Sequence, residues 1–177
     1  FNYSYLTIKN STFSGNSVSS DSGVAAGGGV YNLWGYLTIE NSRFSGNTGS
    51  AVSNNHYGTI RNSTISENIG GAFTSSGDYV VGVGGGVSNS GYLTIENSTI
   101  SGNSAAIDGG GLDNTGGTVT IRNSTISGNV VWSDSYSAYG GGVYNSGYLT
   151  IENSTISGNR VSSDSYSAYG GGVYNSG

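Results

Sequence analysis

Apolar and polar residues alternate with a period of two in short segments that recur along the chain. In Leu149-Thr150-Ile151-Glu152-Asn153, Leu, Ile and Asn fall on one side of an extended backbone, and Thr and Glu fall on the other. The segments 143–145 and 155–157 alternate in the same way around one apolar residue each. The pattern predicts short β-strands that each turn one or two apolar side chains inward.

These segments belong to an internal repeat. The string LTIENSTISGN occupies 93–103 and 149–159, and the string GGGVYNSG occupies 140–147 and 170–177. Variants of both strings occur throughout the chain, and equivalent isoleucines lie between 21 and 35 residues apart. The strings keep their lengths while one stretch between them varies, which is typical of a solenoid coil with loops at one corner.

The loops of variable length all follow an asparagine. These residues are Asn16, Asn47, Asn68, Asn103, Asn129 and Asn159. Loops carry most recognition in repeat proteins, so we expect the loops after Asn16, Asn68, Asn129 and Asn159 to project along one side and to make any contacts with other molecules.

We predict an all-β fold, a right-handed single-stranded parallel β-helix of about six coils with three short strands each. One coil buries about four apolar side chains worth roughly 1.5–3 kcal/mol each, whereas ordering its backbone costs roughly 1–2 kcal/mol per residue. A single coil is therefore unstable, and stacking supplies the missing burial and hydrogen bonds. Residues 1–177 are expected to form one solenoid domain, as a segment of a longer or polymeric rod.

Stacking turns each repeat position into a column of side chains, and three columns of asparagine are predicted to point inward. One is formed by Asn10, Asn41, Asn62, Asn97, Asn123 and Asn153; the second by the six asparagines that precede the loops; and the third by Asn2, Asn32, Asn54, Asn89, Asn114, Asn145 and Asn175. Stacked amides donate and accept hydrogen bonds along a column. Five members of the first column begin Asn-Ser-Thr sequons, but burial at a corner argues against N-glycosylation there.

An outward column carries charges whose signs alternate. It consists of Lys9, Glu40, Arg61, Glu96, Arg122 and Glu152. Opposite charges on neighbouring strands contribute roughly 0.2–1 kcal/mol each, and a slip of one coil would bring like charges together. The column is interpreted as a stabilising ladder that also sets the register.

Tyrosines form a further outward set. Tyr5, Tyr36, Tyr57, Tyr92 and Tyr148 precede the LTI-type strand, and others lie in the GGGVYN strand and in the loops. Exposed tyrosines either stiffen the rod by stacking or bind sugars and partner proteins. Both readings remain open from the sequence.

Composition excludes several classes of protein. The chain has no Cys, one His and 8% charged residues, with a formal net charge of −5. The missing cysteines exclude a disulfide scaffold and thiolate metal sites. The negative charge without basic clusters argues against nucleic acid and anionic membranes, and no apolar run is long enough for a membrane span. We therefore expect no nucleic-acid partner and no membrane insertion of this segment.

No catalytic constellation is evident, and we expect no enzyme and no cofactor. His56 stands alone in a turn and is interpreted as a surface substitution. Asp134 and Asp164 occupy equivalent places in two near-identical loops, which makes them weak candidates for a calcium site. A polysaccharide lyase or hydrolase and an ice-binding solenoid, the latter suggested by a Thr-x-Ser lattice on the strand 155–157 and its equivalents, are minor alternatives.

The repeat resembles the polymorphic outer membrane protein repeats of bacterial surface proteins. Phe13-Ser14-Gly15-Asn16 and Phe44-Ser45-Gly46-Asn47 match the FxxN element of that family, and Gly70-Gly71-Ala72-Phe73 resembles its GGA[ILV] element, with Gly27-Gly28-Gly29-Val30 following it loosely. The resemblance covers nearly the whole chain, with Ile in place of Phe in the later copies. It implies a β-helical, extracellular, adhesive or structural role on a bacterial surface.

The sequence offers no cap for either end of the stack, so we expect end-to-end association with a further coil or with another copy of the chain. The apolar residues expected to be bare at the two ends are Leu6, Ile8, Phe13, Ile151, Ile156 and Val173. The leading interpretation is a non-enzymatic extracellular rod that associates with itself. The alternative is an adhesin whose Tyr/Ser/Asp loops bind a receptor or a glycan.

Overall fold

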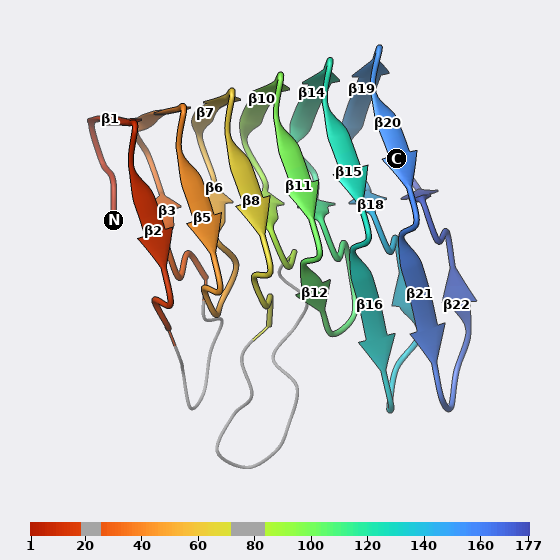
Figure 1. Ribbon diagram of the computed structural model, residues 1–177. Helices are drawn as coiled ribbons and strands as arrows, with labels where there is room; N and C mark the ends of the chain where they lie inside the picture. Colours follow the sequence, from red (N-terminus) through yellow and green to blue (C-terminus); the bar gives the residue numbers. More distant parts are fainter. Residues whose placement is uncertain (19–25, 72–83) are drawn as a thin grey trace.

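The computed structural model describes residues 1–18, 26–71 and 84–177, and all regular elements within these ranges are β-strands. The chain winds into coils whose equivalent strands lie side by side, so that each sheet runs along the length of the rod (Figure 1). Every strand pair is parallel. Six coils are stacked, as the repeat predicts.

Three six-stranded sheets form the walls of the rod. The first contains β1 (Tyr5–Lys9), β4 (Tyr36–Glu40), β7 (Tyr57–Arg61), β10 (Tyr92–Glu96), β14 (Thr118–Arg122) and β19 (Tyr148–Glu152). The second contains β2 (Thr12–Ser14), β5 (Arg43–Ser45), β8 (Thr64–Ser66), β11 (Thr99–Ser101), β15 (Thr125–Ser127) and β20 (Thr155–Ser157). The third contains β3 (Val30–Asn32), β6 (Val52–Asn54), β9 (Val87–Asn89), β13 (Leu112–Asn114), β18 (Val143–Asn145) and β23 (Val173–Asn175).

Three corners join these walls, and each is named by the residues found there. The Asn-Ser corner joins the first sheet to the second, for example at Asn97 and Ser98. The loop corner joins the second sheet to the third and begins at residues such as Asn103. The tyrosine corner joins the third sheet back to the first, just before residues such as Tyr92.

The core is a continuous apolar column, because the register places like residues over one another in successive coils. Ile95 pairs with Ile60 on one side and with Ile121 on the other, and all three are fully buried. Where two coils carry phenylalanine, the rings of Phe13 and Phe44 stack with centroids 4.7 Å apart. Each coil thus covers the apolar face of its neighbour, as the predicted energetics require.

The run of glycines before the third sheet is required by close packing between coils. A Cβ atom added to Gly111 would lie 2.8 Å from the carbonyl oxygen of Gly142 and 2.9 Å from Nδ2 of Asn129. A Cβ atom at Gly86 would lie 2.7 Å from the carbonyl oxygen of Gly111. The glycine string therefore reflects the approach of backbone and asparagine side chains, and not a ligand site.

The loop corner carries strands beyond the three per coil that the sequence predicted. β12 (Ser104–Ala105), β16 (Val130–Ser133) and β21 (Arg160–Ser163) form one added sheet, and β17 (Ala138–Tyr139) pairs with β22 (Ala168–Tyr169). They extend along one side of the rod (Figure 1). The loops after Asn129 and Asn159 are equally long and nearly identical, so their backbones pair in register. The loops after Asn16 and Asn68 fall largely in 19–25 and 72–83, outside the described residues.

The two terminal coils expose part of their apolar residues. Ile151 and Val173 are each 36% exposed, and Leu6, Phe13 and Ile156 are half-buried. Ile8, expected to be bare, is instead buried, because it packs into the main core cluster of the rod. No helix in the described parts of the chain is long and apolar enough to cross a membrane.

Candidate functional site

The asparagines of the loop corner form a buried ladder that binds each coil to the next. Nδ2 of Asn103 donates to Oδ1 of Asn129 at 2.9 Å and to the carbonyl of Ile65 at 3.0 Å. Oδ1 of Asn103 accepts from both Nδ2 and the backbone N–H of Asn68, at 2.9 and 3.0 Å. The four inner members, from Asn47 to Asn129, are fully buried. The prediction of an inward column at this corner is confirmed.

A second buried ladder runs along the tyrosine corner. Nδ2 of Asn54 donates to Oδ1 of Asn89 at 2.8 Å, and Nδ2 of Asn89 donates to Oδ1 of Asn114 at the same distance. The amide of Asn54 also donates to the carbonyls of His56 and Tyr92. Each asparagine therefore satisfies backbone oxygens of the turn that follows it and of the turn in the next coil, as the sequence suggested.

The third predicted inward column is wrong, because its asparagines lie outside the rod. Asn10, Asn41, Asn62, Asn97, Asn123 and Asn153 are all exposed. Their φ angles lie between 47° and 49°, in the left-handed region that asparagine tolerates better than most residues. This backbone conformation turns the corner and directs the side chain to solvent. The sequons at this corner are consequently exposed, so burial gives no reason to set N-glycosylation aside.

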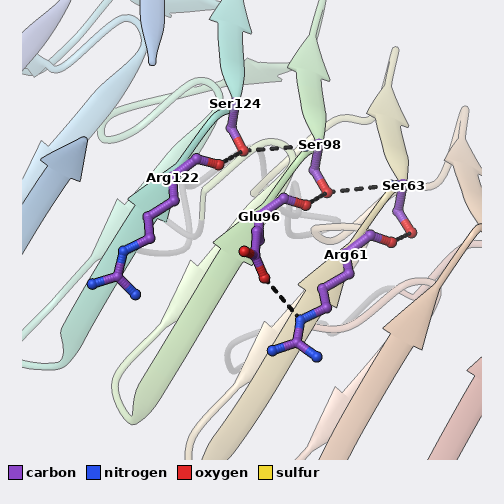
Figure 2. Close-up of polar contacts among 6 residues, drawn as sticks. All are labelled: Arg61, Ser63, Glu96, Ser98, Arg122 and Ser124. Atoms are coloured by element: carbon purple, nitrogen blue, oxygen red, sulfur yellow. Dashed lines mark hydrogen bonds and ion pairs between the residues drawn. The ribbon is translucent and has the colours of Figure 1, made fainter. Parts of the chain in front are cut away.

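Serines replace the asparagines on the inner side of the Asn-Ser corner. The hydroxyl of Ser98 donates to the carbonyl of Glu96 at 2.7 Å and accepts from the backbone N–H of Ser63 at 3.2 Å. The hydroxyls of Ser63 and Ser124 each make the same two kinds of bond, and Figure 2 shows those of Ser98 and Ser124 accepting from the serine of the neighbouring coil. Sequence reasoning missed this ladder, although the serine of every Asn-Ser pair is as regular as the asparagine.

The charge column forms an ion pair at every second junction between adjacent coils. Nζ of Lys9 lies 2.9 Å from a carboxylate oxygen of Glu40, and Nε of Arg61 lies 3.0 Å from one of Glu96 (Figure 2). Nε of Arg122 lies 2.6 Å from an oxygen of Glu152. These side chains are between 31% and 57% exposed, so each pair is worth little by itself.

Two pKa shifts show which interactions dominate in the charge column. The hydrogen bond from Lys9 lowers the pKa of Glu40, and the charges of Lys9 and Arg61 lower it further against a small opposing effect of burial. The hydrogen bond with Glu152 raises the pKa of Arg122. The pKa values of Glu40 and Arg122 thus respond to the opposite charges in both adjacent coils, which supports the interpretation of a register-setting ladder.

The tyrosines at the start of the first sheet stack on one another. The ring centroids of Tyr5 and Tyr36 are 5.0 Å apart, and those of Tyr36 and Tyr57 and of Tyr57 and Tyr92 are 5.1 Å apart, with interplanar angles of 12° or less. His56 is half-buried beside this stack and meets the ring of Tyr57 edge-on at 4.6 Å. His56 is therefore part of an aromatic cluster rather than an isolated surface substitution.

The carboxylate of Asp113, in β13 of the third sheet, is buried, and that of Asp108, in the turn before it, is half-buried. Burial raises the pKa of Asp113 to about 7, with a hydrogen bond from Thr115 opposing the shift and the charge of Asp108 adding to it. Burial also raises the pKa of Asp108 to about 6. Sequence reasoning did not single out either residue, because nothing in the repeat marks their positions as covered.

The candidate calcium ligands Asp134 and Asp164 are exposed at the loop corner. They follow β16 and β21, which are paired in register, and the backbone N–H of Asp164 donates to the carbonyl of Ser133 at 3.0 Å. Among the described residues, no three of His, Cys, Asp and Glu are grouped so as to hold a metal ion. The calcium site stays a prediction.

A family model for the right-handed β-helix region matches residues 1–177. The chain therefore belongs to the right-handed β-helix family, and the predicted fold class, including its handedness, is confirmed. No curated protein and no solved structure matches the chain. The family match shows the architecture of the chain.

Proposed function

We propose that this chain is a non-enzymatic structural rod that extends by stacking coil upon coil, whether the next coil belongs to the same chain or to another copy. The observation that carries the proposal is the register of the ladders. Within the described residues, the two asparagine ladders and the serine ladder continue from coil to coil, so most buried polar side chains hold neighbouring coils together.

The chemistry of the terminal coils supports the stacking. β1 and β19 each have one neighbour in the first sheet and offer an unpaired strand edge on the other side. The charge column has Lys9 in the first coil and Glu152 in the last, so a copy placed end to end would continue the alternation of signs. Partly exposed Ile151 and Val173 supply apolar area at the same end.

We further propose an extracellular or cell-surface location in a bacterium. Support comes from the likeness of the FxxN elements, such as Phe13 to Asn16, to those of bacterial surface proteins. A surface rich in Gly, Ser and Asn with 8% charged residues is compatible with such a setting.

The stacking is tested by changing an end residue and a loop residue in parallel. Ile151→Lys places a charge in the proposed contact between copies, whereas Tyr166→Lys makes the same change at the loop corner, where the side chain is 63% exposed. Light scattering of the 177-residue chain over a range of concentrations should show assembly for the parent and for Tyr166→Lys. Ile151→Lys should remain a monomer with an unchanged circular dichroism spectrum.

A parent chain that remains monomeric at all concentrations would overturn the stacking proposal. Assembly that stops in Tyr166→Lys but persists in Ile151→Lys would assign self-association to the loops instead. Electron micrographs of the assembled material should show rods longer than one chain.

A second candidate function is adhesion through the loop corner, and exposed aromatic residues favour it. Trp132, Tyr136 and Tyr166 are between 47% and 63% exposed on the added strands and the loops beside them. Exposed aromatic side chains are common anchors for receptors and glycans. Under this function, Tyr166→Lys should weaken attachment to the cells or glycans that the parent binds, without changing assembly.

A further inference from the structure

The tyrosine stack of the first sheet is interrupted in one coil. The register pairs Tyr92 with Thr118 and pairs Thr118 with Tyr148, so threonine occupies the position that tyrosine holds in the other five coils. The turn before Thr118 consists of Gly116 and Gly117, which add no side chain to the gap. Tyr92 and Tyr148 are thus separated by one missing ring.

The gap is a pocket between two aromatic walls. It has a volume of about 210 Å³ and is lined by Tyr92, Tyr148, Thr118, Ser90 and the adjoining glycines. Tyr92 is 57% exposed, against 42% for Tyr57, which has a ring on each side. Tyr148 is 80% exposed, as much as Tyr5 at the end of the stack. Both walls therefore have faces that no tyrosine covers.

The width of the gap suits one ring. Two strand spacings are about 9.6 Å, and the intact part of the stack places successive ring centroids 5.0 to 5.1 Å apart. A single six-membered ring halfway between Tyr92 and Tyr148 would therefore lie at stacking distance from both. The volume is below the roughly 300–1,000 Å³ of pockets for drug-sized ligands, which is consistent with one ring.

The floor of the gap is polar. Within the described parts of the chain, the side-chain hydroxyls of Thr118 and Ser90 have no hydrogen-bond partner, whereas the serine and asparagine ladders of the same coils are fully engaged. Hydroxyl groups beside two aromatic faces complement a pyranose, which has apolar C–H faces and a rim of hydroxyl groups. A purely aromatic ring would stack on Tyr92 and Tyr148 but would leave the hydroxyls of Thr118 and Ser90 without hydrogen-bond partners.

We propose that this gap, the Thr118 slot, binds one pyranose ring of a glycan, with the ring held between Tyr92 and Tyr148 and its hydroxyls bonded to Thr118 and Ser90. The site goes beyond the structural role and does not depend on self-association. It is also separate from the loop corner, because it lies at the tyrosine corner between the third and first sheets.

Saturation-transfer NMR with a set of methyl pyranosides (glucose, galactose, mannose, xylose and N-acetylglucosamine) tests the slot, with p-cresol as the aromatic probe. At least one sugar should give a saturable signal with the 177-residue chain. Thr118→Tyr completes the tyrosine stack, so it should reduce the affinity by about tenfold or more while the melting temperature stays the same or rises.

Two terminal tyrosines of equal exposure provide the matched control. Tyr148→Ala removes a wall of the slot and should lose the sugar signal, whereas Tyr5→Ala removes an equivalent ring elsewhere and should keep it. The Ile151→Lys variant should bind the sugar as the parent does, which separates this site from the stacking proposal. Unchanged binding in Thr118→Tyr, equal losses in both alanine variants, or binding of p-cresol with no sugar binding would each overturn the proposal.

Discussion

Asn97 and Asn103 lie six residues apart in the same coil and have opposite roles. Asn103 is fully buried and holds two neighbouring coils through its amide, whereas Asn97 is exposed and has a φ of 49°. Both recur in every coil, and both follow a short strand. The regular recurrence of a polar residue therefore shows that the residue is required at a corner. It does not show whether the requirement is for its side-chain hydrogen bonds or for its backbone conformation.

The two corners differ in which side chain forms the hydrogen bonds to the backbone of the turn. At the loop corner the asparagine side chain bonds to backbone groups of adjacent coils. At the Asn-Ser corner the backbone conformation of asparagine makes the turn, and the hydroxyl of the next serine does the bonding. Substitutions at the two corners should separate these roles.

Asn103→Ala should have the largest effect. The substitution removes four buried hydrogen bonds worth roughly 0.5–1.5 kcal/mol each, and it leaves the backbone N–H of Asn68 without its partner at a further cost of roughly 1–3 kcal/mol. We expect a loss of at least about 4 kcal/mol in the free energy of unfolding, measured by urea denaturation. A loss no greater than that of Asn97→Ala would contradict the assignment of the two columns.

Asp113→Asn should stabilise the rod at neutral pH. Asp113 alternates with buried Leu112 and Asn114 and so points outward, yet it is only 2% exposed. Its pKa is raised to about 7 from 3.8, so the folded state retains a proton that the unfolded state releases between these values. Stability therefore falls as the pH rises from about 4 to about 7, and it stays at the lower level above that range.

The amide of Asp113→Asn cannot ionise, so this loss should disappear. We expect the variant to be more stable than the parent by on the order of 2–4 kcal/mol at pH 8 and to match it near pH 4. Thermal melts at both pH values measure the difference. Asp108, whose raised pKa acts in the same direction, should leave a smaller pH dependence in the variant. Equal pH profiles for parent and variant would show that Asp113 is not the group responsible.

Ser98→Ala should cost about 2 kcal/mol. The carbonyl of Glu96 and the backbone N–H of Ser63 would each lose a buried partner, although the former lies near solvent. Ser98→Thr restores a hydroxyl and serves as the control for the lost hydrogen bonds. A neutral Ser98→Ala, measured by the same urea titration, would mean that water replaces the serine ladder.

Asn97 should be the most tolerant of the three positions. Asn97→Ala should cost about 1 kcal/mol, since alanine is disfavoured in the left-handed region, and Asn97→Gly should change stability by less than about 0.5 kcal/mol. Thermal melts of the two variants give the comparison. A larger loss for glycine than for alanine would imply that the side chain of Asn97 makes a contact that matters.

The sequence predicted the coils, the core and the side of the loops after Asn129 and Asn159 well, because a strict repeat makes each position report on the same environment many times. The inward isoleucines, two asparagine ladders and the charge column all lie where the alternation placed them. The orientation of Asn97 and its equivalents was wrong, because period-two alternation holds only within strands. A left-handed residue at a corner shifts the pattern, so that Ser98 becomes the inward residue.

The candidate sites were less predictable for a related reason. Asp113 is buried although it lies on an outward position, and its burial depends on neighbouring segments rather than on the repeat. The Thr118 slot exists because threonine replaces tyrosine in one coil while the two adjacent coils keep Tyr92 and Tyr148. Among the added strands at the loop corner, β17 and β22 pair between two neighbouring loops of equal length, whereas β12 and β16 pair between loops of different length.

The alternating charges also constrain how the gene can change in length. Deleting the coil that carries Glu96 would set Arg61 beside Arg122, whereas deleting two adjacent coils restores an opposite pair. The string LTIENSTISGN, which carries the column, recurs two coils apart at 93–103 and 149–159, whereas the loop string SDSYSAYGGGVYNSG recurs in adjacent coils at 133–147 and 163–177. A change in length by two coils therefore keeps the signs of the charge column alternating, whereas a change by one coil places two like charges side by side.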